Sequence, residues 1–133
     1  MSYFIFMRNI DEGKAIPVYG DGSQFRDFTY VDDIARGTIA ALKPLGYEVI
    51  NLGGHEVITI NGLVELIEEL AGKKANVQHG APNLADMFMN QANVTKAREV
   101  LGWDPQVNLR EGIKRLIDWY LAERSWAKEV LTP

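Results

Sequence analysis

The residues best suited to chemistry lie early in the chain, where a glycine turn comes shortly before an arginine. Residues 17–22 read Pro-Val-Tyr-Gly-Asp-Gly, and Arg26 and Asp27 follow. A strand offers backbone hydrogen-bonding groups to a nucleotide base, and a guanidinium binds phosphate oxygens through a planar fork of N–H groups. The pattern therefore predicts a site for a nucleoside diphosphate, in which Arg26 faces the pyrophosphate and Asp27 holds that arginine in place.

Each of these residue types also has an ordinary structural explanation. Asp-Gly is a common turn dipeptide, so residues 20–22 can form a plain bend, and the arginine can pair with its neighbouring aspartate at the surface. Asp32 and Asp33 can be metal ligands or catalytic carboxylates, but carboxylates at a helix start cap free N–H groups, and we favour that interpretation. His55 and His79 are far apart and lack partners at ligand spacing, so we expect no metal site.

Alternating helices and strands must position these side chains. The spacing of apolar residues predicts helices over residues 3–12, 33–42, 60–71, 93–101 and 109–121, and strands over residues 15–19, 48–52 and 74–79. We expect Thr59, Asn93 and Asn108 to cap helices, the last in a capping box with Glu111. This order argues for α/β packing in a single domain over residues 1–133, with residues 125–133 as a frayed tail.

The composition limits the classes of protein to consider. The 133 residues are 47% hydrophobic and carry a net charge of −4, which suits a globular domain with a real core. Lysines and arginines do not form a basic stripe, so we expect no nucleic-acid partner. No apolar run is long enough to span a membrane. The chain has no cysteine, which excludes disulfides and thiolate metal sites and favours a cytoplasmic location.

Several segments, in order along the chain, resemble the NAD-dependent nucleotide-sugar epimerases and dehydratases, which are extended short-chain dehydrogenases. The matching segments are residues 6–22, 26–34, 51–53, 92–97, 101–105 and 109–113. Within that family, the Arg-Asp-Phe-Thr-Tyr of residues 26–30 and the Ala-Asp-Met of residues 85–87 are most similar to UDP-glucuronate 4-epimerases, with UDP-glucose 4-epimerases close behind.

The resemblance implies roles for individual residues. Pro17, Val18 and Tyr19 match the strand that contacts the uracil. Arg26 matches the arginine that binds the pyrophosphate, and Asp86 matches the acidic residue that accepts hydrogen bonds from the ribose hydroxyls.

Two positions depart from the family pattern. Asn83 stands where many members carry Arg or Gln, the Arg being a second phosphate contact, and Asn90 replaces an aromatic residue seen in some relatives. Both substitutions bear on the strength of nucleotide binding.

The sequence also lacks the family's catalytic and cofactor motifs. Neither the glycine fingerprint that seats NAD nor a Tyr-x-x-x-Lys pair occurs in it, and family members are about twice as long or more. The resemblance therefore implies an α/β carboxy-terminal substrate-binding portion, without the amino-terminal Rossmann half. NAD is the cofactor of the full-length family, and we expect this chain alone to bind none.

The resulting expectation is a UDP-sugar-binding part of an epimerase that is not catalytic alone. Whether the chain belongs to a working enzyme stays open. The alternative is a stand-alone, non-catalytic binding or interaction module derived from the same fold. The strand at residues 48–52 would belong to the edge of the absent sheet, so the expected partners also include a missing half or a second copy of the chain.

Overall fold

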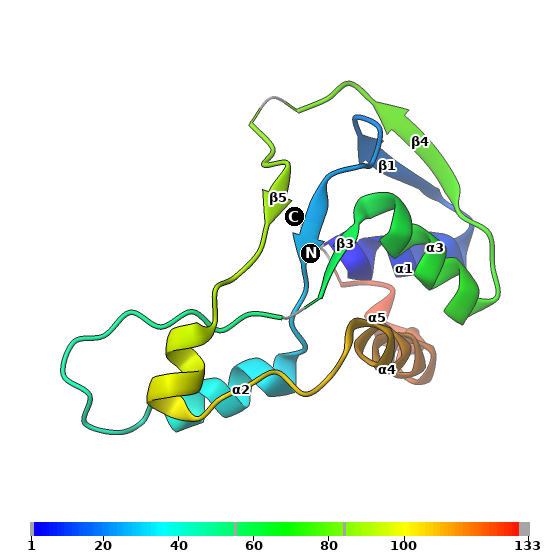
Figure 1. The fold of residues 1–133 in the computed structure, drawn as a ribbon. Coiled ribbons are helices and arrows are strands. Elements are labelled where there is room, and N and C mark those ends of the chain that lie inside the picture. Colours follow the sequence, from blue (N-terminus) through cyan, green and yellow to red (C-terminus); the bar gives the residue numbers. More distant parts are fainter. Residues whose placement is uncertain (1, 55, 84, 131–133) are drawn as a thin grey trace.

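The computed structural model describes residues 2–54, 56–83 and 85–130 and has a mixed α/β architecture, which confirms the predicted fold class (Figure 1). The elements, in chain order, are α1 (Ser2–Glu12), β1 (Ala15–Tyr19), β2 (Phe25–Asp27), α2 (Val31–Ala40), β3 (Val57–Thr59), α3 (Ile60–Ala71), β4 (Asn76–Gly80), β5 (Met89–Asn90), the π-helix η1 (Ala97–Leu101), α4 (Leu109–Ala122) and α5 (Arg124–Ala127).

The strands of the described residues form two small sheets. β1 and β4 pair in parallel, with Tyr19 opposite Gly80. β2 lies between β3, which is antiparallel to it, and β5, which is parallel to it. The carboxyl ends of β1 and β4 therefore lie side by side, although they are far apart in sequence (Figure 1).

The main core lies where α1, α3 and α4 pack together beside β1. Its fully buried side chains alternate along β1 and recur at helical spacing on the helices: Met7, Ile10, Ile16, Val18, Leu63, Ile67 and Tyr120. Thr59 caps α3 by accepting a hydrogen bond from Gly62 N at 2.9 Å, as predicted. Asn108 likewise accepts from Glu111 N at 2.9 Å, but the Glu111 carboxylate binds Arg115, so half of the expected capping box forms.

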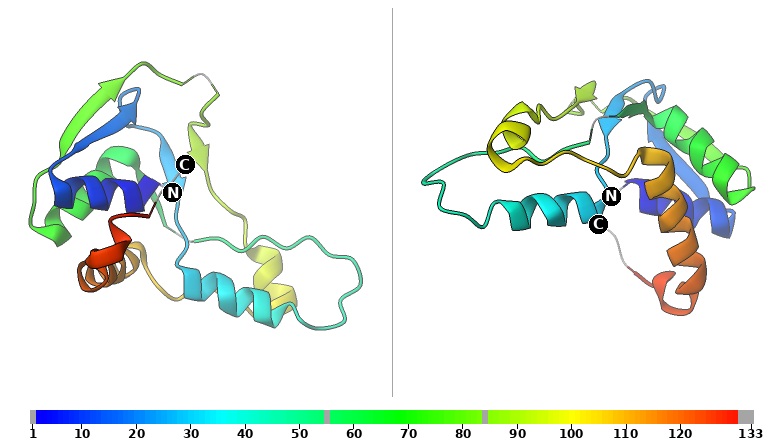
Figure 2. Two further views of the ribbon diagram at one scale, coloured as in Figure 1. Left: turned by 180° about the vertical axis from the view of Figure 1, so that it is seen from behind. Right: turned by 60° about the horizontal axis from the view of Figure 1, so that its bottom comes forward.

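A second, smaller core lies at the other end of the molecule, where η1 and α2 pack side by side (Figures 1 and 2). It contains Val94, Ala97 and Trp103, with Leu52 packed against them. Gly37 lets α2 approach this cluster, because a Cβ there would lie 2.7 Å from Leu52 and 2.9 Å from the Trp103 ring nitrogen. The Trp103 indole N–H donates to Asp33 O at 2.8 Å.

The strand predicted at residues 48–52 is wrong: these residues have no regular structure. A strand needs a neighbour for its backbone groups, and none of the described strands pairs with this segment. The short strands β3 and β5, in contrast, are not predicted by the sequence pattern. Both exist because β2 lies between them, and their two or three residues are too few to show a period-two pattern.

The prediction that Asp32 or Asp33 caps a helix is also wrong. The N-cap of α2 is Tyr30, which makes no side-chain cap bond, so both aspartates lie inside the first turn. Asp33 is only 1% exposed, and its Oδ2 accepts hydrogen bonds from Gln106 N at 3.1 Å and Val107 N at 3.0 Å. The carboxylate therefore ties the segment before α4 to α2.

The end of the chain, where we expected fraying from residue 125, is helical as far as Ala127 in α5. Ala127 is fully buried, and Arg8 Nη1 donates to Val130 O at 2.7 Å. Residues 131–133 lie outside the described part. None of the helices in the described ranges is long and apolar enough to cross a membrane.

Candidate functional site

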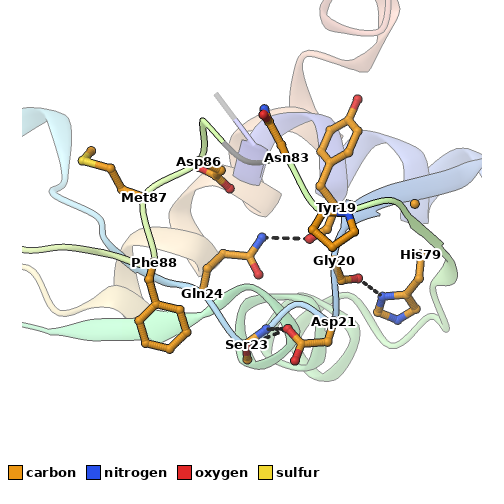
Figure 3. A pocket seen from close by; sticks show the side chains of 12 residues that line it. Tyr19, Gly20, Asp21, Ser23, Gln24, His79, Asn83, Asp86, Met87 and Phe88 are labelled. Carbon is orange, nitrogen blue, oxygen red and sulfur yellow. Dashed lines mark hydrogen bonds between the residues drawn. The ribbon is translucent and has the colours of Figure 1, made fainter.

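A pocket of about 750 Å³ opens between the turn after β1 and the segment that joins β4 to β5 (Figure 3). The described residues that line it are Tyr19, Gly20, Asp21, Ser23, Gln24, His79, Gly80, Pro82, Asn83, Asp86, Met87 and Phe88. The volume is in the range typical of small-molecule sites. The lining combines exposed aromatic rings with a few polar groups, so the pocket suits a ligand that has both a flat ring and hydroxyls.

The glycine turn after β1 forms one wall of the pocket. Gly20 and Gly22 have φ of 71° and 76°, a left-handed backbone that glycine adopts without strain. Asp21 Oδ1 accepts hydrogen bonds from Ser23 N at 3.0 Å and from the Ser23 hydroxyl at 2.6 Å. The turn is fastened to β4 by Gly20 N, which donates to Gly80 O at 3.1 Å, and by a His79 Nδ1 contact of 2.9 Å to Gly20 O.

The segment after β4 forms the opposite wall and carries two of the predicted residues (Figure 3). Asn83 starts a tight turn: its Oδ1 accepts from Ala85 N at 3.0 Å, and its main-chain oxygen accepts from Asp86 N at 3.0 Å. This turn places Asn83 and Asp86 on the same wall of the pocket. Asparagine forms such turns readily, because its short side chain reaches its own backbone two residues on.

Arg26 lies behind this wall rather than in the pocket. Its Nη1 donates to Phe25 O at 2.6 Å and to Met87 O at 2.8 Å, and its Nη2 binds Asp86 Oδ1 in an ion pair. The Arg26 side chain is 20% exposed, and Arg26 is not among the described lining residues. The guanidinium therefore joins β2 to the loop that carries Asp86.

The charge on the described lining residues is acidic. Hydrogen bonds from the Ser23 hydroxyl and the Ser23 backbone N–H hold the pKa of Asp21 below its usual value, so this carboxylate is ionised at neutral pH. Asp86 is the other carboxylate of the lining, and no lysine or arginine is found among the lining residues described. These groups accept hydrogen bonds from hydroxyls, whereas a diphosphate would need the guanidinium of Arg26 behind the wall.

Of the six residues predicted to bind substrate, Tyr19, Asn83 and Asp86 line this pocket. Pro17 lies with Tyr19 on the exposed face of β1, whereas the Val18 side chain is buried in the main core and can offer a ligand only its backbone.

Asp27 does not hold Arg26, contrary to the prediction. Adjacent strand residues point to opposite faces, and Asp27 Oδ2 accepts from Ala92 N at 3.0 Å instead. The carboxylate that does contact Arg26 is that of Asp86.

Sequence reasoning missed Gln24, His79 and Phe88 as lining residues. Gln24 Nε2 donates to Tyr19 O at 3.1 Å, and the Phe88 ring packs edge-on against Phe25 at 5.9 Å between centroids. No motif marks Gln24 or Phe88. Phe88 reaches the pocket through a contact with Phe25 that is distant in sequence, whereas Gln24 follows the glycine turn and contacts Tyr19 five residues away. His79 stands out in the sequence only as a possible metal ligand, and the described residues include no group of three or more potential ligands. His55 lies outside the described residues.

Gly53 and Gly54, the only adjacent glycines of the chain, do not form a dinucleotide cradle. A Cβ at Gly53 would lie 2.2 Å from the Ala92 Cβ, and one at Gly54 would lie 2.4 Å from Asp27 Oδ1. These glycines therefore permit close packing of protein against protein, and no helix of the described part begins directly after them. This glycine pair thus offers no cradle for the phosphates of NAD.

Comparison with known proteins supports the resemblance that the motifs indicate. Residues 2–53 match the model of the NAD dependent epimerase/dehydratase family. The chain is 51% identical over 120 residues to the UDP-glucuronate 4-epimerase of Thermodesulfobacterium geofontis, a match that covers 90% of this chain and 37% of that protein.

Solved structures of epimerases have the same fold over this region. The UDP-glucuronic acid 4-epimerase of Bacillus cereus, in complex with UDP-glucuronic acid and NAD, superposes with a TM-score of 0.86 at 32% identity over 92% of this chain and 40% of the epimerase. The UDP-glucose 4-epimerase of Thermotoga maritima, with UDP-glucose, gives a TM-score of 0.85 at 32% identity over 90% of this chain and 39% of the other.

This chain is similar in sequence and fold to one part of the members of the NAD-dependent epimerase/dehydratase family. It spans 37% of the length of the Thermodesulfobacterium geofontis relative.

Proposed function

We propose that this chain is the nucleotide-sugar-binding part of an NAD-dependent UDP-sugar epimerase. One observation supports this above the others: Tyr19 on β1 lines one pocket of ligand size together with Asn83 and Asp86 on the segment after β4, and the family resemblance singles out all three in the sequence. Convergence of such residues from different elements is typical of a binding site.

In this proposal the ligand lies with its base along β1 and its ribose beside Asp86. The exposed edge and backbone of Pro17, Val18 and Tyr19 contact the uracil. The Asp86 carboxylate accepts hydrogen bonds from the two ribose hydroxyls, as an ionised carboxylate is an acceptor only. Arg26 supplies the positive charge that the pyrophosphate needs.

Asn83 gives the site an uncharged donor and acceptor. A side-chain amide binds a phosphate oxygen more weakly than a guanidinium does, because the hydrogen bond lacks charge assistance. We infer that the affinity for UDP rests on Arg26 and Asp86 more than on Asn83.

The chain is not catalytic alone in this proposal. In the family, NAD removes a hydride from the sugar and returns it, and the sequence holds neither the glycine fingerprint nor the Tyr-x-x-x-Lys pair. We propose that it binds no cofactor by itself, that a nucleotide-binding half supplies the rest of the site, and that it works in the cytoplasm.

Calorimetric titration of the purified chain with UDP tests the proposal. We expect saturable binding that Asp86→Ala weakens by about tenfold or more, the scale of one charge-assisted hydrogen bond. Asp118→Ala is the matched control, because it removes an exposed carboxylate on α4 that pairs with Lys114. The absence of both heat and a thermal shift at millimolar UDP would reject a nucleotide site in this chain.

A stand-alone interaction module is the second candidate, and one observation favours it. Large apolar side chains on and after α2 are exposed to solvent: Ile39 at 67%, Leu42 at 82%, Tyr47 at 92% and Val49 at 67%. Exposed apolar patches are typical of protein interfaces. A chain that binds another protein through this face, and shows no affinity for UDP, fits this second function.

A further inference from the structure

The interactions of Arg26 suggest a role beyond phosphate binding. Two hydrogen bonds from Nη1 go to main-chain oxygens, one on β2 and one at Met87, and the Nη2 contact goes to the Asp86 carboxylate. A residue that served only to bind phosphate would leave its N–H groups facing the ligand. Here at least three of the five N–H donors of the guanidinium are used within the protein.

These contacts fix the loop that carries the acidic acceptor. Phe25 N donates to Phe88 O at 2.7 Å. Arg26 binds Asp86 and Met87, which are the two residues that precede Phe88. Asp86 and Met87 are the described residues between β4 and β5 to which Arg26 donates hydrogen bonds. Without that fork, the turn at Asn83 and the hydrogen bond between Phe25 and Phe88 would be left to orient Asp86.

The Asp86 carboxylate is thereby divided between protein and pocket. Oδ1 accepts from Arg26, and Oδ2 has no hydrogen-bond donor among the described residues. Because Asp86 lines the pocket, the second oxygen is available to hydroxyl groups of a ligand. An ion pair that fixes one oxygen also restricts the rotation of the carboxylate, so less entropy is lost when a ligand binds the other.

We propose that Arg26 is a positioning residue for the nucleoside end of the ligand: it orients Asp86 so that Oδ2 accepts the ribose hydroxyls. The inference rests on the proposed function. It predicts that Arg26 contributes to the binding of a nucleoside that carries no phosphate, which a purely phosphate-binding arginine would not do.

The test compares uridine with UDP, both titrated against the chain and its variants by protein NMR. We expect Arg26→Ala to weaken uridine binding by about tenfold or more, the scale of one hydrogen bond to a charged group. Arg26→Lys keeps the charge but loses the planar fork, so it should restore only part of the affinity for uridine. Amide exchange of residues 85–88 should become faster in Arg26→Ala than in the unsubstituted chain.

Two further variants separate positioning from general damage. Arg110→Ala removes an exposed bidentate pair with Glu69 and should leave uridine binding unchanged. In a chain that already carries Asp86→Asn, Arg26→Ala should cause little further loss for uridine, because the acceptor that Arg26 orients is already altered.

The outcomes are distinct. One outcome is that Arg26→Ala keeps its fold by circular dichroism and weakens the binding of UDP, but changes uridine binding by less than about twofold. This outcome overturns the positioning role and leaves the proposed function standing. The positioning role is also overturned if Arg26→Ala weakens uridine binding as much in a chain that carries Asp86→Asn as in the unsubstituted chain. An unsubstituted chain that binds neither uridine nor UDP overturns the proposed function, and the positioning role with it.

Discussion

Asp33 is the residue whose substitution tests the fold most directly. Its carboxylate accepts hydrogen bonds from Gln106 N, Val107 N and the Arg36 guanidinium, while Asp33 itself is 1% exposed. The bonds join α2 to the segment before α4 and so hold the two cores of the molecule together. We predict that Asp33→Asn destabilises the chain, although the side chain keeps nearly the same shape.

The size of the effect follows from these contacts. A hydrogen bond to a charged group contributes about 1.5–3 kcal/mol. An asparagine oxygen in the place of Oδ2 can still accept from both backbone N–H groups, but these two bonds lose their charge and the bond from Arg36 is lost. The amide is also cheaper to bury than a carboxylate, which offsets part of the loss. We therefore expect a decrease of about 2–4 kcal/mol in the free energy of unfolding. This is a large part of the total, because the free energy of unfolding of a typical domain is about 5–15 kcal/mol.

The effect must depend on pH in a defined direction. Burial acts to raise the pKa of Asp33, but the Val107 N–H, the Arg36 guanidinium and the Gln106 N–H outweigh it, and the pKa lies below its usual value. A lowered pKa in the folded state stabilises the fold above the unfolded pKa of about 3.9. This stabilisation is lost as the pH falls from that value through the folded-state pKa.

Urea unfolding at pH 7 and at pH 3, followed by tryptophan fluorescence, measures both effects. The difference in stability between the unsubstituted chain and Asp33→Asn should be largest at pH 7 and smaller at pH 3. Asp32→Asn is the matched control, because its side chain is 66% exposed and should change stability by less than about 0.5 kcal/mol. Equal stability of Asp33→Asn and the unsubstituted chain at pH 7 would refute the reasoning.

Two further predictions concern the pocket wall and the exposed apolar face. Gly22→Ala should destabilise the chain by about 1–3 kcal/mol in urea unfolding, because its Cβ would lie 2.0 Å from Asn61 Oδ1 in a left-handed backbone. Gly13→Ala, equally left-handed but with nothing within 4 Å, should cost less, and an equal cost would refute the clash. The exposure of Leu42 and Tyr47 predicts self-association in sedimentation velocity, which Leu42→Lys should reduce; a monomer at all concentrations would contradict this.

The sequence predicts the long elements well and the strand pairings poorly. α1, β1, α3 and α4 each carry a periodic apolar pattern over five or more residues, and their ends are marked by residues such as Gly13, Thr59 and Asn108. β3 and β5 are too short for any pattern and depend on β2, a partner that sequence alone does not reveal. The strand prediction over residues 48–52 is wrong for the opposite reason, since this segment has a strand-like pattern but no partner strand in the described residues.

The candidate site shows the same limit at the level of single residues. Motif resemblance finds Tyr19, Asn83 and Asp86, which line the pocket, because the residue types are visible in the sequence. It cannot show which carboxylate Arg26 contacts, because the choice between Asp27 and Asp86 depends on which face of β2 a side chain occupies.

That choice changes what the arginine does. An Arg26 paired with the adjacent Asp27 would be a local surface contact, of little consequence for a ligand. Paired with Asp86, it links β2 to the loop that lines the pocket, and also reaches the main-chain oxygen of Met87. A single guanidinium then affects both the charge available to a pyrophosphate and the orientation of the acceptor for the ribose. The two ends of a nucleotide would accordingly be recognised as a coupled unit, so that substitutions at Arg26 and Asp86 combine non-additively.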